Sequence, residues 1–173
     1  DALRMITLAP ECCDQQAVEI LLRAGIRVSV GHSNATYQQA MRAFSETGIR
    51  LATHLFNAMS PLQTREPGLV GAIFEHAAVY ASIIADGIHV HPASIRISKA
   101  LMGERLFLIT DAVEENTAGT YVYLRQQDRY VNQEGVLAGS TLTMLKAVAN
   151  CVQLMDMALD EALRMASWYP AKA

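Results

Sequence analysis

The feature that most constrains the fold is an alternation of short apolar runs with helix-like segments. The apolar residues of five such runs are nearly continuous instead of alternating, which is typical of parallel strands that are covered on both faces. The rhythm of strand and helix predicts a βα barrel or a doubly wound α/β sheet. The runs have the length and the β-branched residues of strands, and they are Met5–Ala9, Val28–His32, Leu51–Phe56, Tyr80–Asp86 and Leu106–Asp111.

Helix-like segments lie between most of these runs and after the last one, at 14–25, 34–48, 91–103, 140–157 and 160–169. Asn34 is expected to cap the second of them and Gly48 to end it. One insertion breaks the rhythm, because residues from about 119 to 135 alternate in polarity around a polar turn at Gln127 and Asp128, which predicts a hairpin. No flexible linker divides the chain, so residues 1–173 are expected to form a single segment.

Ionisable side chains close four consecutive strand-like runs. These residues are His32, His54, Asp86 and Asp111. In a βα barrel the active site is built from the carboxyl ends of successive strands, whereas a doubly wound sheet places its site at one switch point. Four consecutive polar strand ends therefore favour the barrel. Because buried polar groups without partners are unfavourable, we expect a metal and a substrate to pair with them.

The two strand-end histidines predict a metal site. His32 and His54 close neighbouring strands, so both imidazoles can point into one barrel mouth. Imidazole and carboxylate ligands suit zinc or another divalent ion such as iron, and the number of ions, one or two, stays open. Two histidines need at least one further ligand. Asp111 could supply it, or could act as the general base that takes a proton from an attacking water.

A polar loop and a further histidine suggest a substrate site beside the metal. The loop after the third strand-like run contains Asn57 and Arg65. An arginine in such a loop suits a phosphate or carboxylate group, with a solvated ion pair as an equal alternative. The loop lacks the pattern of a P-loop. We expect His89 to contact the substrate, whereas His91 and His76 are expected to be peripheral.

Composition and charge exclude several classes of partner. The net charge is -3 and only 14 residues are Lys or Arg, so we expect no nucleic-acid partner. No apolar run reaches the length of a membrane span, and residues 1–10 lack the pattern of a signal peptide, so neither a membrane partner nor export is expected. The three cysteines include an adjacent pair, which is a poor disulfide framework and predicts reduced thiols in the cytoplasm.

Six motifs together resemble one family. GHSNAT, ATHLFNAM, REPGLVGA, IIADGIHV, LITDA and LAGSTLTM follow one another as they do in the N-acetylglucosamine-6-phosphate deacetylases of the amidohydrolase superfamily. The resemblance covers essentially the whole chain and is weakest over 113–135. It implies a (β/α)8 barrel of the TIM type, of which this chain would supply strands four to eight. It also implies metal-dependent hydrolysis of N-acetylglucosamine 6-phosphate to glucosamine 6-phosphate and acetate, in amino-sugar catabolism.

The resemblance implies roles for individual residues. His32 and His54 correspond to the two histidine ligands of the metal, and Asp111 corresponds to the catalytic aspartate. His89 corresponds to a histidine that contacts the sugar and helps to polarise the amide. The other implied contacts are Asn57, Ala58 and Arg65 in a phosphate-binding loop, with Arg65 reaching the neighbouring subunit of a homodimer, and Leu137, Ala138 and Gly139 along the substrate pocket.

The resemblance also implies parts that these residues do not include. The family's third metal ligand is a glutamate on a strand that would precede residue 1, as would three barrel strands and most of a small β-sandwich. Glu11 follows a different strand and does not match that ligand. The chain is therefore expected to be a piece of a longer protein. Three alternatives stay open: deacetylation of N-acetylgalactosamine 6-phosphate, a truncated remnant without catalysis and, more weakly, hydrolysis of cyclic amides.

Overall fold

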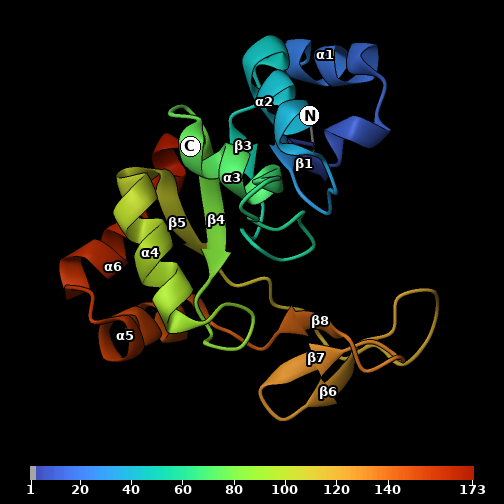
Figure 1. The fold of residues 1–173 in the computed structure, drawn as a ribbon. Helices are drawn as coiled ribbons and strands as arrows, with labels where there is room; N and C mark the ends of the chain where they lie inside the picture. The colour runs from blue at the N-terminus through green and yellow to red at the C-terminus, as the bar shows by residue number, and fades with distance from the viewer. Residues whose placement is uncertain (1–2) are drawn as a thin grey trace.

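A five-stranded parallel sheet forms the centre of the protein. The computed structural model describes residues 3–173, and its main sheet has the strand order β1-β2-β3-β4-β5 (Figure 1). Each strand pairs in parallel with the next one along the chain. This order and pairing confirm the predicted segment of a βα barrel. The strands are β1 (Met5–Leu8), β2 (Arg27–Val30), β3 (Leu51–Ala52), β4 (Tyr80–Ile84) and β5 (Leu106–Ile109).

Helices connect the strands and pack against one face of the sheet. The core joins strand residues such as Val28 and Ile83 to helix residues such as Phe44 and Ile95, all of them buried. Among the described residues, no helix is both long and apolar enough to cross a bilayer. The helices are α1 (Gln15–Arg23), α2 (Tyr37–Arg42) with its π-helical continuation η2 (Ala43–Thr47), α3 (Gly68–Glu75), α4 (Pro92–Met102), α5 (Met144–Met155), α6 (Leu159–Ala166) and α7 (Trp168–Lys172), with 3-10 turns η1 (Pro10–Cys12) and η3 (Gly103–Arg105).

The opposite face of the sheet lines an open hollow. Side chains of β2 alternate, with Val28 and Val30 buried in the core and Arg27 and Ser29 lining a hollow of about 410 Å³. Phe107 lines the same hollow from β5. The strands were predicted to be covered on both faces. In the described part of the chain, helices cover one face and the other lines the hollow. The sheet is open, with β1 and β5 as its edges.

Helix α2 begins two residues later than predicted. Its cap is Thr36, whose hydroxyl accepts the N–H of Gln39 while the Gln39 side chain accepts the N–H of Thr36. Asn34 is not the cap, because its N–H donates to the Glu11 carboxylate at 2.8 Å and the chain is still a loop there. The predicted end of the helical segment is correct, since Gly48 follows η2 with a left-handed φ of 84°.

Helix α3 lies in a segment for which the sequence predicts no helix. The segment contains Pro67 and Gly68, which commonly mark turns, and its apolar run is too short for a clear helical repeat. The helix forms because Leu69 and Ile73 are fully buried in the core. Its first N–H group is satisfied by the Glu66 carboxylate, which accepts from Gly68 N at 3.1 Å.

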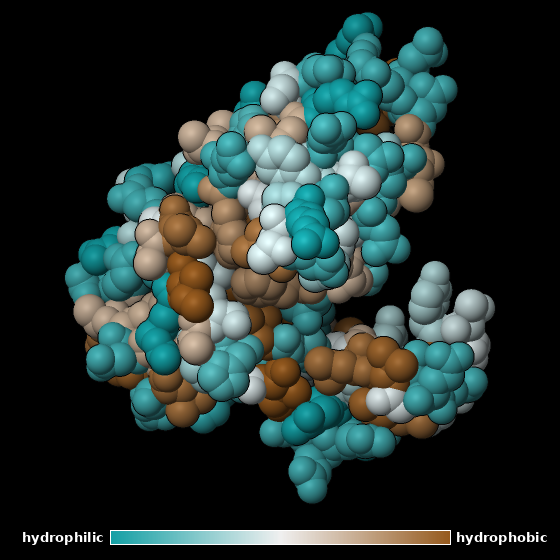
Figure 2. Space-filling model, in the orientation of Figure 1, coloured by the Kyte–Doolittle hydropathy of each residue, from teal (hydrophilic) through white to brown (hydrophobic). Residues whose placement is uncertain are grey.

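A small antiparallel sheet lies beyond the carboxyl ends of the main strands (Figure 1). Strands β6 (Leu124–Gln126) and β7 (Arg129–Val131) form the predicted hairpin, with its turn at Gln127 and Asp128. Strand β8 (Leu137–Ser140) pairs with β7 as a third strand that the sequence did not predict. Figure 2 shows apolar side chains on the surface of this sheet, and a hollow between it and the rest of the molecule.

Arg105 stabilises the carboxyl end of α3. Its guanidinium group donates to the carbonyl oxygens of Val79 at 2.7 Å and His76 at 3.1 Å, and makes longer bonds to Phe74 and Ile73. The last carbonyl groups of a helix have no partner within the helix. Arg105 has no carboxylate partner among the described residues, so it acts here as a donor to the backbone.

Substitution Arg105→Ala is expected to lower the free energy of unfolding by about 1–3 kcal/mol, because it leaves partly buried carbonyl groups without donors. Urea unfolding of the two proteins at one pH measures the change. Arg42→Ala is the control, since it removes an exposed arginine at the end of α2, and should change the free energy by less than about 0.5 kcal/mol. Equal effects of the two substitutions would contradict the role assigned to Arg105.

Candidate active site

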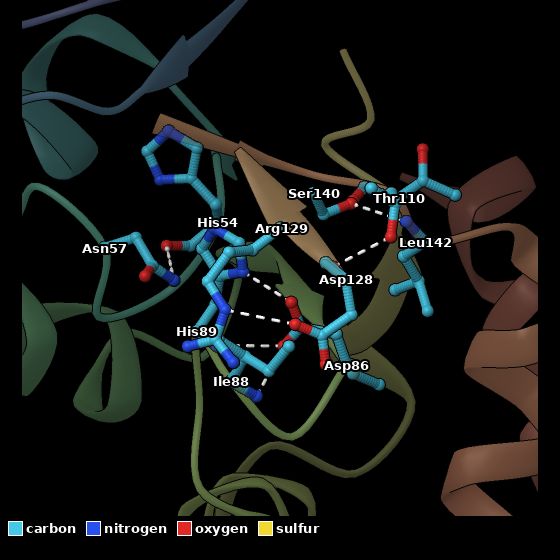
Figure 3. Close-up of polar contacts among 12 residues, drawn as sticks. His54, Asn57, Asp86, Ile88, His89, Thr110, Asp128, Arg129, Ser140 and Leu142 are labelled. Atoms are coloured by element: carbon cyan, nitrogen blue, oxygen red, sulfur yellow. Dashed lines mark hydrogen bonds and ion pairs between the residues drawn. The ribbon is translucent and has the colours of Figure 1, made fainter. Parts of the chain in front are cut away.

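Four ionisable residues lie at one edge of the main sheet. Strands β2 to β5 are neighbours and parallel, so their carboxyl ends meet at the same edge. Figure 3 shows side chains from this edge, among them His54 after β3 and the pair Asp86 and His89 after β4. The structure thus brings together the strand-end residues that the sequence singled out. Each lies two residues beyond the end of its strand: His32 after β2, His54 after β3, Asp86 after β4 and Asp111 after β5.

Three of these residues have a strained backbone. His32, His54 and Asp111 have positive φ angles of 50°, 42° and 49°. Residues other than glycine rarely adopt this left-handed conformation, which costs of order 1–3 kcal/mol at each position. The same unfavourable turn therefore occurs after β2, β3 and β5, and not after β4. Backbone strain clusters at functional sites, so these three residues are candidates for the active site.

His32 and His54, the two histidines among the candidate metal ligands, lie side by side. Their ring centroids are 4.8 Å apart, and the rings are inclined at 75°. The His54 ring is buried, and its Nδ1 atom has no hydrogen-bond partner among the described residues. Burial lowers the pKa of His54; the Asp111 carboxylate opposes this shift, and His32 adds to it. His54 is therefore a neutral imidazole at neutral pH, the form that binds metal ions.

The hydroxyl group of Ser82 fixes the backbone at His54. The N–H of His54 donates to Ser82 Oγ at 2.9 Å, and the next N–H, that of Leu55, donates to the Ser82 carbonyl at 2.8 Å. On the hollow side of the sheet, the hydroxyl of Thr53 lies 2.6 Å from that of Ser29 and 2.9 Å from that of Thr7. These small polar residues were missed in the sequence, where they look like ordinary strand residues.

Glu11 and Ser33 form hydrogen bonds that connect the loops after β1, β2 and β3. The Glu11 carboxylate accepts from Ser33 Oγ at 2.7 Å and from Asn34 N at 2.8 Å, directly after His32. Ser33 also donates its N–H to the Ala58 carbonyl at 3.0 Å and accepts from Ser60 N at 3.1 Å. The loops after β1, β2 and β3 are therefore joined at Ser33, one residue from a candidate metal ligand.

The predicted phosphate-binding loop starts beside His54. The Asn57 side chain donates to the His54 carbonyl at 3.4 Å, as Figure 3 shows, and to the Leu55 carbonyl at 3.3 Å. Ala58 is exposed and has a positive φ of 48°. Arg65 is exposed further along the loop, and the described residues contain no ion-pair partner for it. Asn57 and Ala58 thus lie next to the strand end, whereas no contact joins Arg65 to it.

The other end of this loop is held by Glu66. Its carboxylate accepts from Tyr37 N at 2.7 Å, at the start of α2, and from Gly68 N, at the start of α3. The residue next to Arg65 is therefore anchored to two helices, while the guanidinium group of Arg65 remains in solvent.

His89 is paired with Asp86 beyond the end of β4. The Nδ1 atom of His89 lies 2.5 Å from Asp86 Oδ2, and both side chains are almost fully buried. His91 differs, because it is exposed and its Nδ1 atom caps α4 by accepting from Ala93 N at 3.1 Å. The prediction for His76 was only partly correct, since His76 is half-buried with its ring 5.6 Å from that of Phe44.

Strand β8 brings the predicted pocket segment beside Asp111. Ser140 N donates to the Asp111 carbonyl at 3.0 Å, and Val113 N donates to the Ser140 carbonyl at 3.2 Å. The Ser140 hydroxyl donates to the Thr110 carbonyl (Figure 3). A Cβ atom at Gly139 would lie 2.6 Å from Val113 Cγ2, so only glycine allows this close approach. Leu137, Ala138 and Gly139 therefore run next to the strand end that carries Asp111.

Comparison with known proteins places the chain in a family. The model of the amidohydrolase family matches residues 9–173, and the chain belongs to this family. Over 184 residues the chain is 38% identical to an N-acetylglucosamine-6-phosphate deacetylase of Haemophilus influenzae, covering 100% of this chain and 48% of the relative. It is 39% identical to an N-acetylgalactosamine-6-phosphate deacetylase of Escherichia coli O157:H7, covering 98% of this chain and 47% of that relative.

A solved structure agrees with the same assignment. The crystal structure of N-acetylglucosamine-6-phosphate deacetylase from Pasteurella multocida superposes with a TM-score of 0.92 at 40% identity, over 100% of this chain and 47% of that one. The chain thus spans about half the length of the curated relatives and of the solved structure that it matches.

Family membership implies a divalent metal cofactor, and the residues at the strand ends fit one. His54 offers a buried ring nitrogen without a partner, and His32 lies beside it. Within residues 3–173, however, no three His, Cys, Asp or Glu side chains are arranged to hold a metal ion together. Asp111 therefore does not complete a three-ligand set with the two histidines, and the described residues offer two candidate ligands.

Replacing either His32 or His54 by alanine is expected to weaken zinc binding by more than roughly tenfold, because each removes a ligand. Equilibrium dialysis of the full-length protein against zinc, with metal analysis of the retained protein, measures the affinity. His91→Ala is the matched control, since it removes an exposed histidine at the start of α4, and should leave the affinity unchanged. Unaltered zinc binding in both His32→Ala and His54→Ala would show that these residues are not ligands.

Proposed function

We propose that this protein hydrolyses the acetamide of N-acetylglucosamine 6-phosphate to glucosamine 6-phosphate and acetate. The observation that carries the proposal is the meeting of His32, His54 and Asp111 on strained turns at one edge of the sheet. The names of the relatives support an amino-sugar phosphate as substrate. An amide needs both activation of its carbonyl group and proton transfer to its nitrogen, and the proposed site provides residues for each.

In the proposed site, His32 and His54 hold a divalent ion, for which zinc is the first choice. When bound, such an ion supplies Lewis acidity toward the acetamide carbonyl and lowers the pKa of water. The buried, neutral His54 ring keeps its lone pair available, and Ser82 holds the His54 backbone in place. The number of ions and the identity of the metal are part of this proposal.

Asp111 is the proposed general base and acid. Burial lowers the pKa of His54 and the Asp111 carboxylate opposes this shift, so Asp111 lies near the proposed metal ligand. It takes a proton from the attacking water and delivers it to the amine nitrogen as the carbon–nitrogen bond breaks. The N–H of Ser140 donates to the Asp111 carbonyl, and this bond fixes the position from which the carboxylate extends into the proposed site.

The substrate contacts are proposed around these groups. His89 contacts the sugar and the acetamide from the end of β4, and Leu137, Ala138 and Gly139 line the pocket beside Asp111. Asn57 and Ala58 bind the phosphate group, and Arg65 completes that site within a homodimer. A free, exposed arginine on an anchored loop suits this role. The proposed setting is the cytoplasm, without nucleic-acid or membrane partners.

The N-acetylgalactosamine 6-phosphate reaction is the second candidate. Relatives named for that activity match this chain at 38% and 39% identity, which is as close as those named for the glucosamine enzyme. The two substrates differ in the configuration of one hydroxyl group. Turnover of both epimers by one preparation of the full-length protein decides between them, and a clear preference for the galacto epimer would replace the first proposal.

Asp111→Asn should reduce kcat by roughly 10²- to 10⁴-fold while leaving zinc binding intact, because it removes proton transfer and keeps the size of the side chain. Acetate release and metal content are measured on the same preparation. A turnover near that of the wild type would contradict the role of Asp111, and a loss of zinc would instead identify it as a ligand.

Arg65→Ala is expected to lower kcat/KM for N-acetylglucosamine 6-phosphate by roughly 10- to 100-fold, mainly through a higher KM, because one charge-assisted contact to phosphate is lost. The same substitution should hardly change kcat/KM for N-acetylglucosamine, which has no phosphate. Arg42→Ala is the matched control, because Arg42 is an exposed arginine at the end of α2. An equal loss on both substrates would count against phosphate binding by Arg65.

A further inference from the structure

We propose that Asp86 is a positioning residue that fixes the tautomer of His89 and so determines which ring nitrogen meets the substrate. The inference rests on the proposed function for the identity of the substrate, but its structural part can be tested without turnover. In the sequence Asp86 is one of four polar strand ends, and His89 follows it three residues later.

The carboxylate of Asp86 accepts three hydrogen bonds from its own turn. Oδ1 accepts from Ile88 N at 2.8 Å and from His89 N at 2.9 Å, while Oδ2 meets His89 Nδ1 at 2.5 Å. Burial opposes ionisation of Asp86, but the hydrogen bonds from the His89 ring and from the two N–H groups outweigh it and lower its pKa. Asp86 is therefore a carboxylate at neutral pH and can only accept hydrogen bonds.

An ionised carboxylate determines where the imidazole carries its proton. Because Asp86 Oδ2 can only accept, His89 Nδ1 must be protonated to form the contact. In the neutral ring this leaves Nε2 without a proton and available to the substrate. The side chains of His89 and Asp86 are 5% and 6% exposed, so water does not compete strongly for this bond.

Burial of the pair also explains why the ring needs a partner within the protein. The chain after β4 turns at Gly87, whose φ is 79°, and this turn places the His89 ring back over the Asp86 carboxylate. The ring is thus fixed by one side-chain bond and by the backbone bonds of the same turn. Within the described part of the chain, Nε2 is then the ring nitrogen left to contact a sugar hydroxyl or the acetamide of the proposed substrate.

Substitution Asp86→Asn separates positioning from a purely structural role. The asparagine oxygen can still accept from the N–H groups of Ile88 and His89, so the turn is retained. Its amide group donates to Nδ1 instead of accepting from it, which forces the neutral ring into the Nε2–H tautomer. Asp156→Asn is the matched control, because Asp156 is an exposed residue in the left-handed conformation at the end of α5, which asparagine tolerates.

The first measurement is the ¹⁵N spectrum of His89, assigned by its loss in His89→Gln. We expect the Nδ1–H tautomer in the wild type and in Asp156→Asn, and the Nε2–H tautomer in Asp86→Asn. This readout needs no substrate, so it remains valid if the proposed reaction is wrong. The same tautomer in the wild type and in folded Asp86→Asn would overturn the inference.

The second measurement is kinetic and applies if the wild type releases acetate from N-acetylglucosamine 6-phosphate. Asp86→Asn should lower kcat/KM by roughly 10- to 100-fold. In a His89→Gln background the same substitution should have no further effect, because Asp86 acts through His89. A loss in that background equal to the loss in the wild type would overturn the inference. Absence of acetate release by the wild type would contradict the proposed function. The tautomer measurement would still test the role of Asp86.

Discussion

The candidate site depends on the parallel register of β2 to β5. Val30 pairs with Ala52, Ala52 with Ala81 and Ile84 with Ile109, so the strand ends meet at one edge. A shift of one residue would exchange the side chains that face the core with those that face the hollow. Burial of alternate apolar side chains on the helical face therefore fixes the positions of the polar residues beyond the strand ends.

Hydrogen bonds between loops then hold those residues on unfavourable turns. Glu11 and Ser33 join the loops after three strands, Ser82 holds the backbone at His54, and Ser140 holds the backbone at Asp111. Each of these residues contacts a strand-end loop and not the proposed reacting groups. Their bonds offset the cost of the positive φ angles, which explains how three residues other than glycine adopt the same conformation.

The repeat of strand and helix was sufficient to predict the parallel sheet, and the polar strand ends were sufficient to predict the position of His32, His54 and Asp111. Helix α3 was missed because its buried residues form a short run after Pro67 and Gly68, and only tertiary packing makes it a helix. The bracing role of Glu11 was missed because it depends on a contact with Ser33, 22 residues away. Asp86 carried a signal in its spacing of three residues from His89, whereas strand β8 was hidden in a segment without alternation.

The strand ends of this sheet are proposed to form a metal-dependent amide hydrolase. Release of acetate from N-acetylglucosamine 6-phosphate by the full-length protein, before chelation, after chelation and after return of zinc, tests it most directly. Turnover is expected to be lost on chelation and restored by zinc or another divalent ion. Turnover that persists after complete removal of metal, or no turnover of either sugar epimer in the metal-loaded protein, would contradict it.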